Sequence, residues 1–294
     1  MADPQKDLKK LKPSREFFIG IDSDGCAFDT MEIKHKECFC PSVIKYFGLQ
    51  AVSKYAREAF EFVNLYSRER GKNRFPALIS MLDLLRERPE IKARKVKVPE
   101  LKRLRKWIKE ETRLGNGALK KVVQTTNDPE LKQALMWSED VNARIADMVH
   151  GVPPFPFVRE CLKKAASKAD MMVVSQTPIE ALTREWQEHG IDRFIRVIAG
   201  QEHGTKTEHI ALAARDKYPS EKILMIGDAI GDLKAATDNE ALFFPILPGK
   251  EEMSWKRLFE EGLERFFDNA FKGEYEDTLR REFETALPEG PSWR

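Results

Sequence analysis

The stretch Phe17-Phe18-Ile19-Gly20-Ile21-Asp22-Ser23-Asp24-Gly25 decides the fold of this chain. Its apolar part predicts a buried strand, which ends abruptly in two carboxylates and a glycine. Because side chains alternate along a strand, Asp22 and Asp24 would project to the same side, at the end of the strand where open α/β sheets bind ligands. A simple turn would also tolerate Asp and Gly. Two carboxylates held together at a site repel each other, so they need a cation, a shared proton or both.

The overall composition indicates a globular protein without a global charge that demands a polyanionic partner. The 294 residues are 41% hydrophobic and 33% charged, and 50 basic against 48 acidic side chains leave a net charge of +2. No apolar run approaches the roughly 18 residues of a spanning helix, so we expect no membrane partner. Residues 1–15 lack an apolar signal-peptide core, and the four cysteines show no disulfide-framework spacing. These observations predict a cytoplasmic protein.

The chain divides into two regions with different patterns of apolar residues. Between residues 42 and 149 apolar residues recur at helical spacing without strand alternation, and Asp128-Pro129 predicts the start of one helix. The proline-rich segment 151–156 ends this pattern. We then expect strands over 171–174, 194–199, 222–226 and 242–247, helices over 157–168, 178–189, 208–217 and from 233, and a helical tail over 253–287. Such alternation implies a parallel sheet with right-handed crossovers, interrupted after its first strand by a helical insertion.

Polar side chains follow four of the predicted strands. They are Asp22 and Asp24 after the first, Ser175-Gln176-Thr177-Pro178 after the second, Gly204-Thr205-Lys206 after the third and Gly227-Asp228-Ala229-Ile230-Gly231-Asp232 after the fourth. This ordered set resembles the four motifs of the haloacid dehalogenase superfamily, in the phosphatase branch that includes phosphoglycolate phosphatases and beta-phosphoglucomutase-like proteins. The resemblance covers about residues 16–30 and 150–248. One departure is Cys26, where the pattern usually has Thr or Val.

The resemblance implies a fold class and a division into domains. The fold would be an α/β, Rossmann-like three-layer core with a parallel central sheet and an inserted all-α cap domain. The core would comprise residues 16–32 and 150–294, with a C-terminal helical tail from about residue 253. The cap would comprise residues 33–149, and a cap of this kind excludes water and selects the leaving group.

The resemblance also assigns roles in phosphoryl transfer. Asp22 would be the nucleophile that forms an aspartyl-phosphate, and Asp24 would be the general acid and then the general base. Ser175 would donate a hydrogen bond to the phosphoryl group, with Gln176 beside it in the substrate site. Lys206 would supply a positive charge to the transferring group and to Asp22.

The same set of oxygens implies a metal site. Asp22, Asp228 and the backbone carbonyl of Asp24 form a hard oxygen site that suits Mg²⁺. Asp232 would orient this site from behind the direct ligands, although a carboxylate in the first turn of a helix is also favoured by the helix dipole alone.

Two basic segments of the helical insertion each allow two interpretations, as a binding surface or as a solvated surface. Arg70, Lys72 and Arg74 lie in a Gly-containing loop and would contact an anionic part of the substrate, unless the loop is a solvated turn. The run from Lys92 to Lys106 would bind nucleic acid or form a solvated helix face, and the apolar stripe within it favours the solvated face.

The sequence therefore predicts a Mg²⁺-dependent phosphatase that hydrolyses a small phosphorylated metabolite through an aspartyl-phosphate. A phosphomutase of the same superfamily is one alternative, and a non-catalytic protein that binds nucleic acid or another polyanion is the second. Nucleic acid is not an expected partner of the phosphatase. The sequence names neither the substrate nor the oligomeric state.

Overall fold

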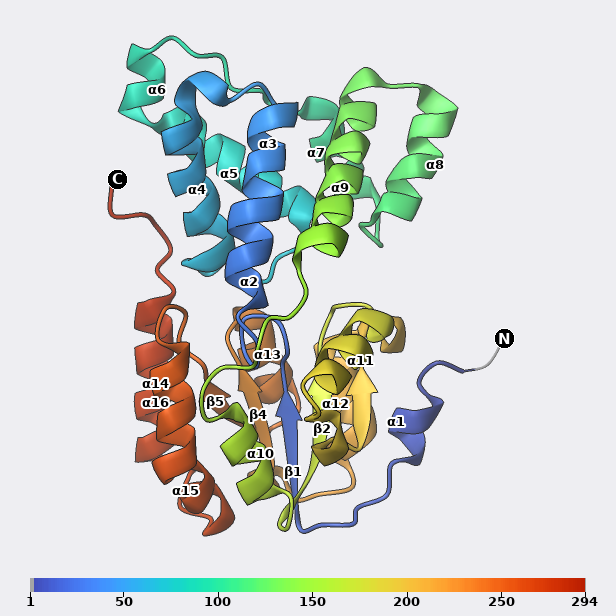
Figure 1. Ribbon diagram of the computed structural model, residues 1–294, viewed down its shortest axis with the longest axis vertical. Coiled ribbons are helices and arrows are strands. Elements are labelled where there is room, and N and C mark those ends of the chain that lie inside the picture. The colour runs from blue at the N-terminus through green and yellow to red at the C-terminus, as the bar shows by residue number, and fades with distance from the viewer. Residues whose placement is uncertain (1–2, 294) are drawn as a thin grey trace. The chain divides into compact units, whose positions relative to one another are not determined.

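The computed structural model describes residues 3–293, which form two compact units (Figure 1). Residues 3–30 and 151–288 form the first, here called the sheet unit. Residues 31–150 and 289–293 form the second, here called the helical unit. The chain therefore passes from one unit to the other at residues 30/31, 150/151 and 288/289.

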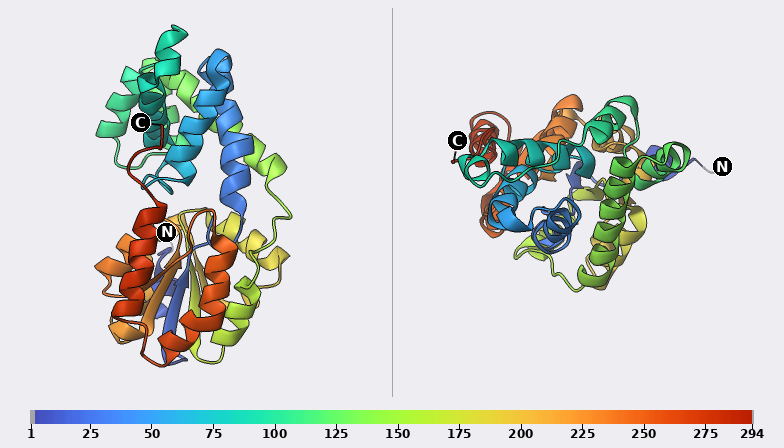
Figure 2. Two further views of the ribbon diagram at one scale, coloured as in Figure 1. Left: turned by 90° about the vertical axis from the view of Figure 1, so that its left-hand side faces the viewer. Right: turned by 90° about the horizontal axis from the view of Figure 1, so that it is seen from above.

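The sheet unit is built on five parallel strands, which run between helices in Figures 1 and 2. Their order is β3-β2-β1-β4-β5. The strands are β1 (Phe17–Ile21), β2 (Ala169–Val174), β3 (Val197–Ala199), β4 (Ile223–Gly227) and β5 (Leu242–Pro245). Ile21 lies in register with Val173 of β2 and Ile226 of β4, so the carboxyl ends of the three central strands share one edge of the sheet.

Strand side chains alternate between two apolar layers, as period-2 geometry requires. Phe17, Ile19 and Ile21 belong to one layer, whereas Phe18 belongs to the other. The first layer is completed by α10 (Val158–Ala165), α11 (Ile179–Glu188), α14 (Glu251–Arg257) and α15 (Leu263–Phe267). The second is completed by α1 (Lys6–Lys10), α12 (Lys206–Ile210) and α13 (Ile230–Asp238). The predicted parallel α/β core is confirmed.

Some predicted bounds are wrong because local geometry interrupts the elements. β3 begins only at Val197, since residues 192–194 form a 3₁₀ turn. The predicted helical tail breaks between α15 and α16 (Glu274–Ala286), with Gly273 at a φ of 97°. After the break, α16 lies against the edge strand β5, where Glu276 accepts a hydrogen bond from the Phe243 amide. The tail thus protects an otherwise open sheet edge.

The helical unit has its own apolar core, in which Trp137 and Phe75 pack edge to face. Its helices are α2 (Thr30–Ile33), α3 (Cys40–Tyr46), α4 (Ser53–Leu65), α5 (Arg74–Glu87), α6 (Pro89–Ala93), α7 (Lys102–Glu110), α8 (Asn116–Thr126) and α9 (Pro129–Met148). The α9 start is confirmed, because Asp128 accepts hydrogen bonds from the amides of Glu130 and Leu131. Within residues 3–293, no helix combines the length and the apolar character that crossing a membrane requires.

The last described residues belong to the helical unit, although the sequence-based division placed them in the core. The Trp293 ring packs edge to face on Phe62, with ring centroids 5.7 Å apart. The guanidinium of Arg88 lies 4.5 Å from the same ring, and Glu289 pairs with Arg68 at 2.9 Å. These contacts attach residues 289–293 to α4 and to the start of α6.

Candidate active site

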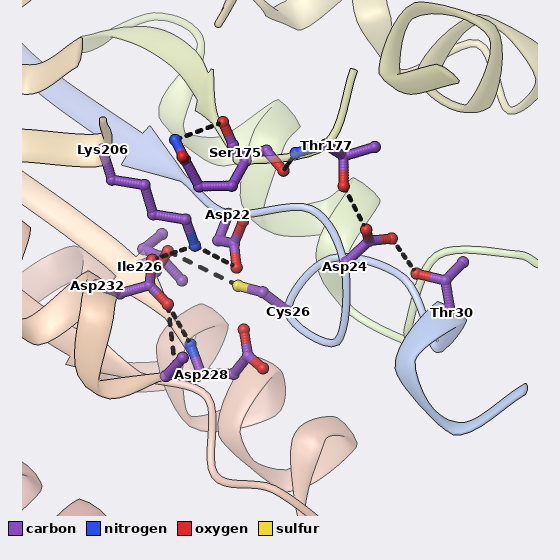
Figure 3. A network of polar contacts seen from close by, with 12 residues as sticks. Asp22, Asp24, Cys26, Thr30, Ser175, Thr177, Lys206, Ile226, Asp228 and Asp232 are labelled. Atoms are coloured by element: carbon purple, nitrogen blue, oxygen red, sulfur yellow. Dashed lines mark hydrogen bonds and ion pairs between the residues drawn. The ribbon is translucent and has the colours of Figure 1, made fainter. Parts of the chain in front are cut away.

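Polar side chains from the ends of four strands meet at the carboxyl edge of the sheet (Figure 3). Asp22 directly follows β1, and its amide continues the ladder by donating to Ile226 O at 3.0 Å. The loop after it turns tightly, because the amides of Ala27 and Phe28 both donate to Ser23 O and Gly25 has a φ of 76°. This turn keeps Asp22, which is 4% exposed as a residue, beside the end of β4.

Lys206 joins Asp22 to Asp232. Its Nζ lies 2.9 Å from Asp22 Oδ2 and 2.6 Å from Asp232 Oδ1. The second oxygen of Asp232 accepts hydrogen bonds from the amides of Asp228 and Ala229, at 3.2 and 3.0 Å. A Cβ at Gly227 would lie 2.3 Å from the Asp232 Cβ, so this turn requires glycine. Asp232 therefore fixes both the lysine and the backbone that carries Asp228.

The position of Lys206 follows from a well-formed helix start. Thr205 caps α12 by accepting from the Glu208 amide at 3.2 Å, and Glu208 accepts in return from the Thr205 amide at 2.7 Å. This reciprocal pair is a capping box, readable in the sequence as Thr205-Lys206-Thr207-Glu208. It makes Lys206 the first residue of α12, whereas the sequence predicted the helix to start at residue 208.

Burial and mutual repulsion govern the charges of this cluster. Burial raises the pKa of Asp22 well above its usual value; the positive charge of Lys206 opposes this shift, and the charges of Asp232 and Asp228 add to it. Burial alone would lower the pKa of Lys206, but the same three carboxylates outweigh it and raise that pKa. The cluster thus holds one permanent cation among three acidic groups.

The donor set fits a divalent cation. Carboxylate oxygens of Asp22, Asp228 and Asp232 lie within 4.8 Å of one another, and all three residues are buried. If all three ionise beside one lysine, two negative charges remain uncompensated, which a dication would neutralise. All donors are hard oxygens, the type that Mg²⁺ prefers. Since the Asp232 oxygens already bind Lys206 and two amides, Asp22 and Asp228 are the better direct ligands.

Asp24 lies in the same loop but has different partners. In Figure 3 its carboxylate points toward two threonines, while Asp22 points toward Lys206. Thr30 Oγ1 donates to Asp24 Oδ1 at 2.5 Å, and Thr177 Oγ1 donates to Asp24 Oδ2 at 2.6 Å. Sequence reasoning missed both threonines as partners. The only signal for Thr177 was its place two residues after Ser175, in a loop already marked as functional.

Ser175 and Gln176 lie in the loop that follows β2. The Ser175 amide donates to Ala199 O, and its buried hydroxyl accepts from the Thr177 amide at 3.2 Å. The Gln176 side chain donates to Gly204 O at 2.9 Å. Gln176 therefore ties the loop after β2 to the loop that leads into Lys206.

Buried contacts support the loop after β1 from behind. Trp186 Nε1 of α11 donates to Ser23 Oγ at 2.9 Å, and Ser23 Oγ donates to Glu185 at 3.0 Å. Trp255 Nε1 of α14 donates to Cys26 O at 2.7 Å. The Cys26 thiol is fully buried and lies 3.7 Å from Ile226 O, so a residue of Cys size fits behind Asp22.

The three basic residues expected to contact substrate have partners inside the helical unit. Arg70 is buried and donates to Leu65 O at 3.0 Å. Arg74 donates to Ser138 Oγ at 2.9 Å and to Asn142 Oδ1 at 2.7 Å, and burial lowers its pKa to about 10. Lys72 is exposed and pairs with Glu69 at 3.2 Å. Their role in substrate binding stays a prediction.

Comparison with known proteins places this chain in a family. The model of the haloacid dehalogenase-like hydrolases matches residues 92–244, slightly more than half of the chain. No curated protein matches the sequence.

Several solved structures are similar to the chain. One is a haloacid dehalogenase-like family hydrolase from Xanthomonas campestris, at 12% identity over 88% of this chain and 96% of that one, with a TM-score of 0.45. A family protein from Streptococcus pneumoniae is 13% identical over 82% and 90%, with a TM-score of 0.42. A predicted phosphoglycolate phosphatase from Haemophilus somnus is 15% identical over 79% and 86%, with a TM-score of 0.41.

The sheet order, the acidic cluster at its carboxyl edge and the family match agree on one assignment. The chain belongs to the haloacid dehalogenase-like hydrolases, and it is an enzyme of that family.

Proposed function

We propose that this protein is a Mg²⁺-dependent phosphatase that hydrolyses a small phosphorylated metabolite through an aspartyl-phosphate. One observation supports the proposal most strongly: Lys206 bridges Asp22 and Asp232 beside Asp228, within a buried edge of the sheet. Phosphoryl transfer depends mainly on positioning and charge neutralisation, and this cluster provides an oxygen nucleophile, a fixed cation and a place for a second cation.

In the first half-reaction, an Asp22 oxygen attacks phosphorus and forms an acyl phosphate while the bond to the leaving oxygen breaks. Asp24 gives its proton to that oxygen, so the product leaves as an alcohol. Lys206 lies 2.9 Å from Asp22, where it offsets the charge of the phosphoryl group during transfer. For this role the Asp24 carboxyl must exchange a threonine hydroxyl for the leaving oxygen.

In the second half-reaction, water attacks the phosphorus of the acyl phosphate. Asp24, now ionised, takes a proton from that water, and phosphate leaves while the Asp22 carboxylate is regenerated. Ser175 would hold the phosphoryl group by donating its hydroxyl hydrogen to a phosphate oxygen, while its oxygen accepts from the Thr177 amide, and Gln176 keeps this loop attached to the one that carries Lys206.

Mg²⁺ would be held by Asp22, Asp228 and the backbone carbonyl of Asp24, with Asp232 orienting the group. When bound, the ion neutralises phosphate charge and the repulsion among the carboxylates. The helical unit, with Arg70, Lys72 and Arg74, would act as the cap that selects the substrate. Cytoplasmic location stays a prediction.

The Asp22→Asn variant tests this function. We expect it to abolish the Mg²⁺-dependent release of phosphate from an aryl phosphate, because an amide oxygen is a poor nucleophile and a weaker ligand. Asp216→Asn, an exposed aspartate of the same unit, serves as the matched control and should keep full activity. Retained activity in Asp22→Asn would reject the covalent mechanism. A product that keeps its phosphate would instead indicate a mutase.

A further inference from the structure

Charge is distributed unequally along this nearly neutral chain. Residues 31–150 contain 25 basic and 16 acidic side chains, whereas the rest of the chain contains 25 basic and 32 acidic ones. The helical insertion therefore carries a net charge of +9, and the remainder carries −7. Residues 91–110 alone contain nine basic and two acidic side chains. The basic excess of the insertion is concentrated in this one segment.

The segment presents its charges to solvent. It comprises the end of α6, the connection 94–101 and α7, which Figure 1 shows as parts of the helical unit. Eight of its basic residues are exposed, and we call them the basic strip: Lys92, Arg94, Lys95, Lys97, Lys102, Arg103, Lys106 and Lys109. Salt bridges give acidic partners to Lys102, Arg103 and Lys106. Within residues 3–293, Lys92, Lys95, Lys97 and Lys109 have no acidic partner within salt-bridge distance.

Most of the basic strip makes no contact that builds the helical unit; the exceptions are Arg94, which donates to Ala51 O and lies over the Tyr55 ring, and Arg103, which pairs with Asp128. α7 uses its other side for packing, where Leu104 and Trp107 are buried. The interaction of Trp107 with Phe75 is edge to face at 5.0 Å, so that ring is unavailable to a ligand. The charged side of α7 therefore takes no part in the apolar core and faces solvent.

The chemistry of the strip favours a phosphate backbone over a membrane. Lys102, Lys106 and Lys109 share one side of α7, and at 1.5 Å rise per residue they extend over about 10 Å, roughly three base-pair steps measured along the axis of a duplex. Lipid insertion needs exposed apolar side chains, but the large exposed ones in the described chain are Met136, Met148 and Met253, outside the segment.

A concave surface lies beside the basic strip, and two lysines of the strip line it. Its volume is about 750 Å³, and it is lined by Arg86, Lys97 and Lys102, by the carboxylates Glu100 and Glu130, and by apolar residues that include Val98, Pro99 and Leu101. Glu100 pairs with Lys102, so Arg86 and Lys97 are the cations of this hollow that Glu100 does not neutralise. A ridge such as a sugar-phosphate backbone would place a phosphate against Lys97 there, and a second phosphate would have to displace Glu100 from Lys102. Because no aromatic ring lines this hollow, bases would gain no stacking partner in it.

We propose that the basic strip binds the phosphate backbone of a nucleic acid without reading its sequence. This binding would be separate from the phosphatase site and would be carried by the helical unit. We therefore revise the sequence-based preference for a solvated helix face, because four lysines of the segment have no acidic partner within salt-bridge distance among the described residues, and residues 91–110 carry a net charge of +7.

Fluorescence anisotropy with a labelled 30-base-pair DNA duplex of random sequence tests this proposal over 50 to 200 mM salt. The test variant replaces Lys92, Lys95, Lys97 and Lys109 with Gln. The matched control replaces Lys10, Lys12, Lys163 and Lys272 with Gln, four exposed lysines of the sheet unit. Circular dichroism melting verifies that both variants fold.

We expect the wild type to bind with an affinity that falls steeply with salt. The test variant should bind at least tenfold more weakly at 50 mM salt and with a shallower salt dependence, while the control stays within about twofold. Absence of binding by the wild type, or an equal loss in both variants, would overturn the proposal. So would salt-sensitive self-association in sedimentation without duplex binding, since the acidic sheet unit of a second copy would then be the occupant.

Discussion

The sheet unit and the helical unit use charge in opposite ways. At the carboxyl edge of the sheet, Asp22 and Asp232 are buried, and Lys206, whose side chain is 15% exposed, pairs with both of them. In the helical unit, the basic strip is exposed and only partly paired. Buried charges are held in fixed geometry and are costly to disturb, whereas exposed charges are screened and can change at little cost. Catalysis in the sheet unit should therefore be sensitive to the loss of single residues, whereas binding by the basic strip should depend on its summed positive charge.

Removal of Lys206, the cation shared by two buried carboxylates, should have the largest effect. Lys206→Met leaves Asp22 and Asp232 without their shared partner inside the protein. We expect a loss of about 3–5 kcal/mol in the free energy of unfolding, together with loss of phosphatase activity. Urea unfolding at pH 5 and pH 8 measures this loss in the free energy of unfolding. The loss should be greater at pH 8, because at pH 5 the unpaired carboxyls take up protons more readily.

A loss below 1 kcal/mol at both pH values would contradict this expectation. It would show that the buried cluster tolerates an uncompensated charge, and the proposed difference between the units would then fail.

Arg74 tests whether a partly buried cation of the helical unit behaves like Lys206 of the sheet unit. Arg74→Met removes hydrogen bonds to Ser138 and Asn142 while keeping much of the contact with the Phe39 ring. We expect a loss of about 2 kcal/mol in the free energy of unfolding. Steady-state kinetics on the same variant separates the roles, because a raised KM without loss of stability would show that Arg74 serves the substrate rather than the fold.

Asp170 lies near the start of β2, at the opposite edge of the sheet from the candidate site. Burial opposes its ionisation, but hydrogen bonds from the Ser14 hydroxyl and amide, from Tyr218 and from the Arg15 amide outweigh it and lower its pKa to about 2. A carboxyl whose pKa is depressed on folding stabilises the protein above its unfolded pKa of about 3.9. That contribution disappears as the pH falls toward 2.

Asp170→Asn should therefore cost about 1–2 kcal/mol at pH 7. The difference from wild type should narrow between pH 4 and pH 2.5, as followed by urea unfolding in small pH steps. A difference that stays constant over that range would show that the packing of Asp170, and not its charge, accounts for the loss.

An exposed pair of the helical unit should show the smallest effect. Lys72→Met breaks a salt bridge to Glu69 whose side chains are 46% and 35% exposed. We expect a change below about 0.5 kcal/mol in the free energy of unfolding. A large rise in KM with unchanged stability would support the predicted contact of Lys72 with substrate, and a large loss of stability would contradict the view that exposed charges matter little.

Sequence reasoning predicted the parts of the molecule that local patterns and sheet topology determine. Asp22, Lys206 and Asp228 each follow a strand, and parallel strands present their carboxyl ends at one edge, so their meeting was predictable. The start of α9 was equally predictable, because the signal for an N-cap lies within a few residues of Asp128.

Partners that lie far apart in the chain could not be predicted in the same way. The hydroxyl of Thr177 reaches Asp24 across 153 positions, and Trp255 reaches the Cys26 carbonyl across 229. Such contacts depend on how the loops and helices pack, which no local pattern encodes. The internal bonds of Arg74 were missed for the same reason, since its partners on α9 lie 64 and 68 residues away.

The chain crosses between the two units for a third time at residues 288/289, and this crossing affects how the molecule responds to a pulling force. Residue 3 belongs to the sheet unit and residue 293 to the helical unit, so stretching the molecule by its two ends would first load the contacts of Trp293 with Phe62 and Arg88. Those contacts would rupture before the pull acted directly on α16 through residue 288. A force trace should then begin with a short extension at low load, well before the main unfolding event.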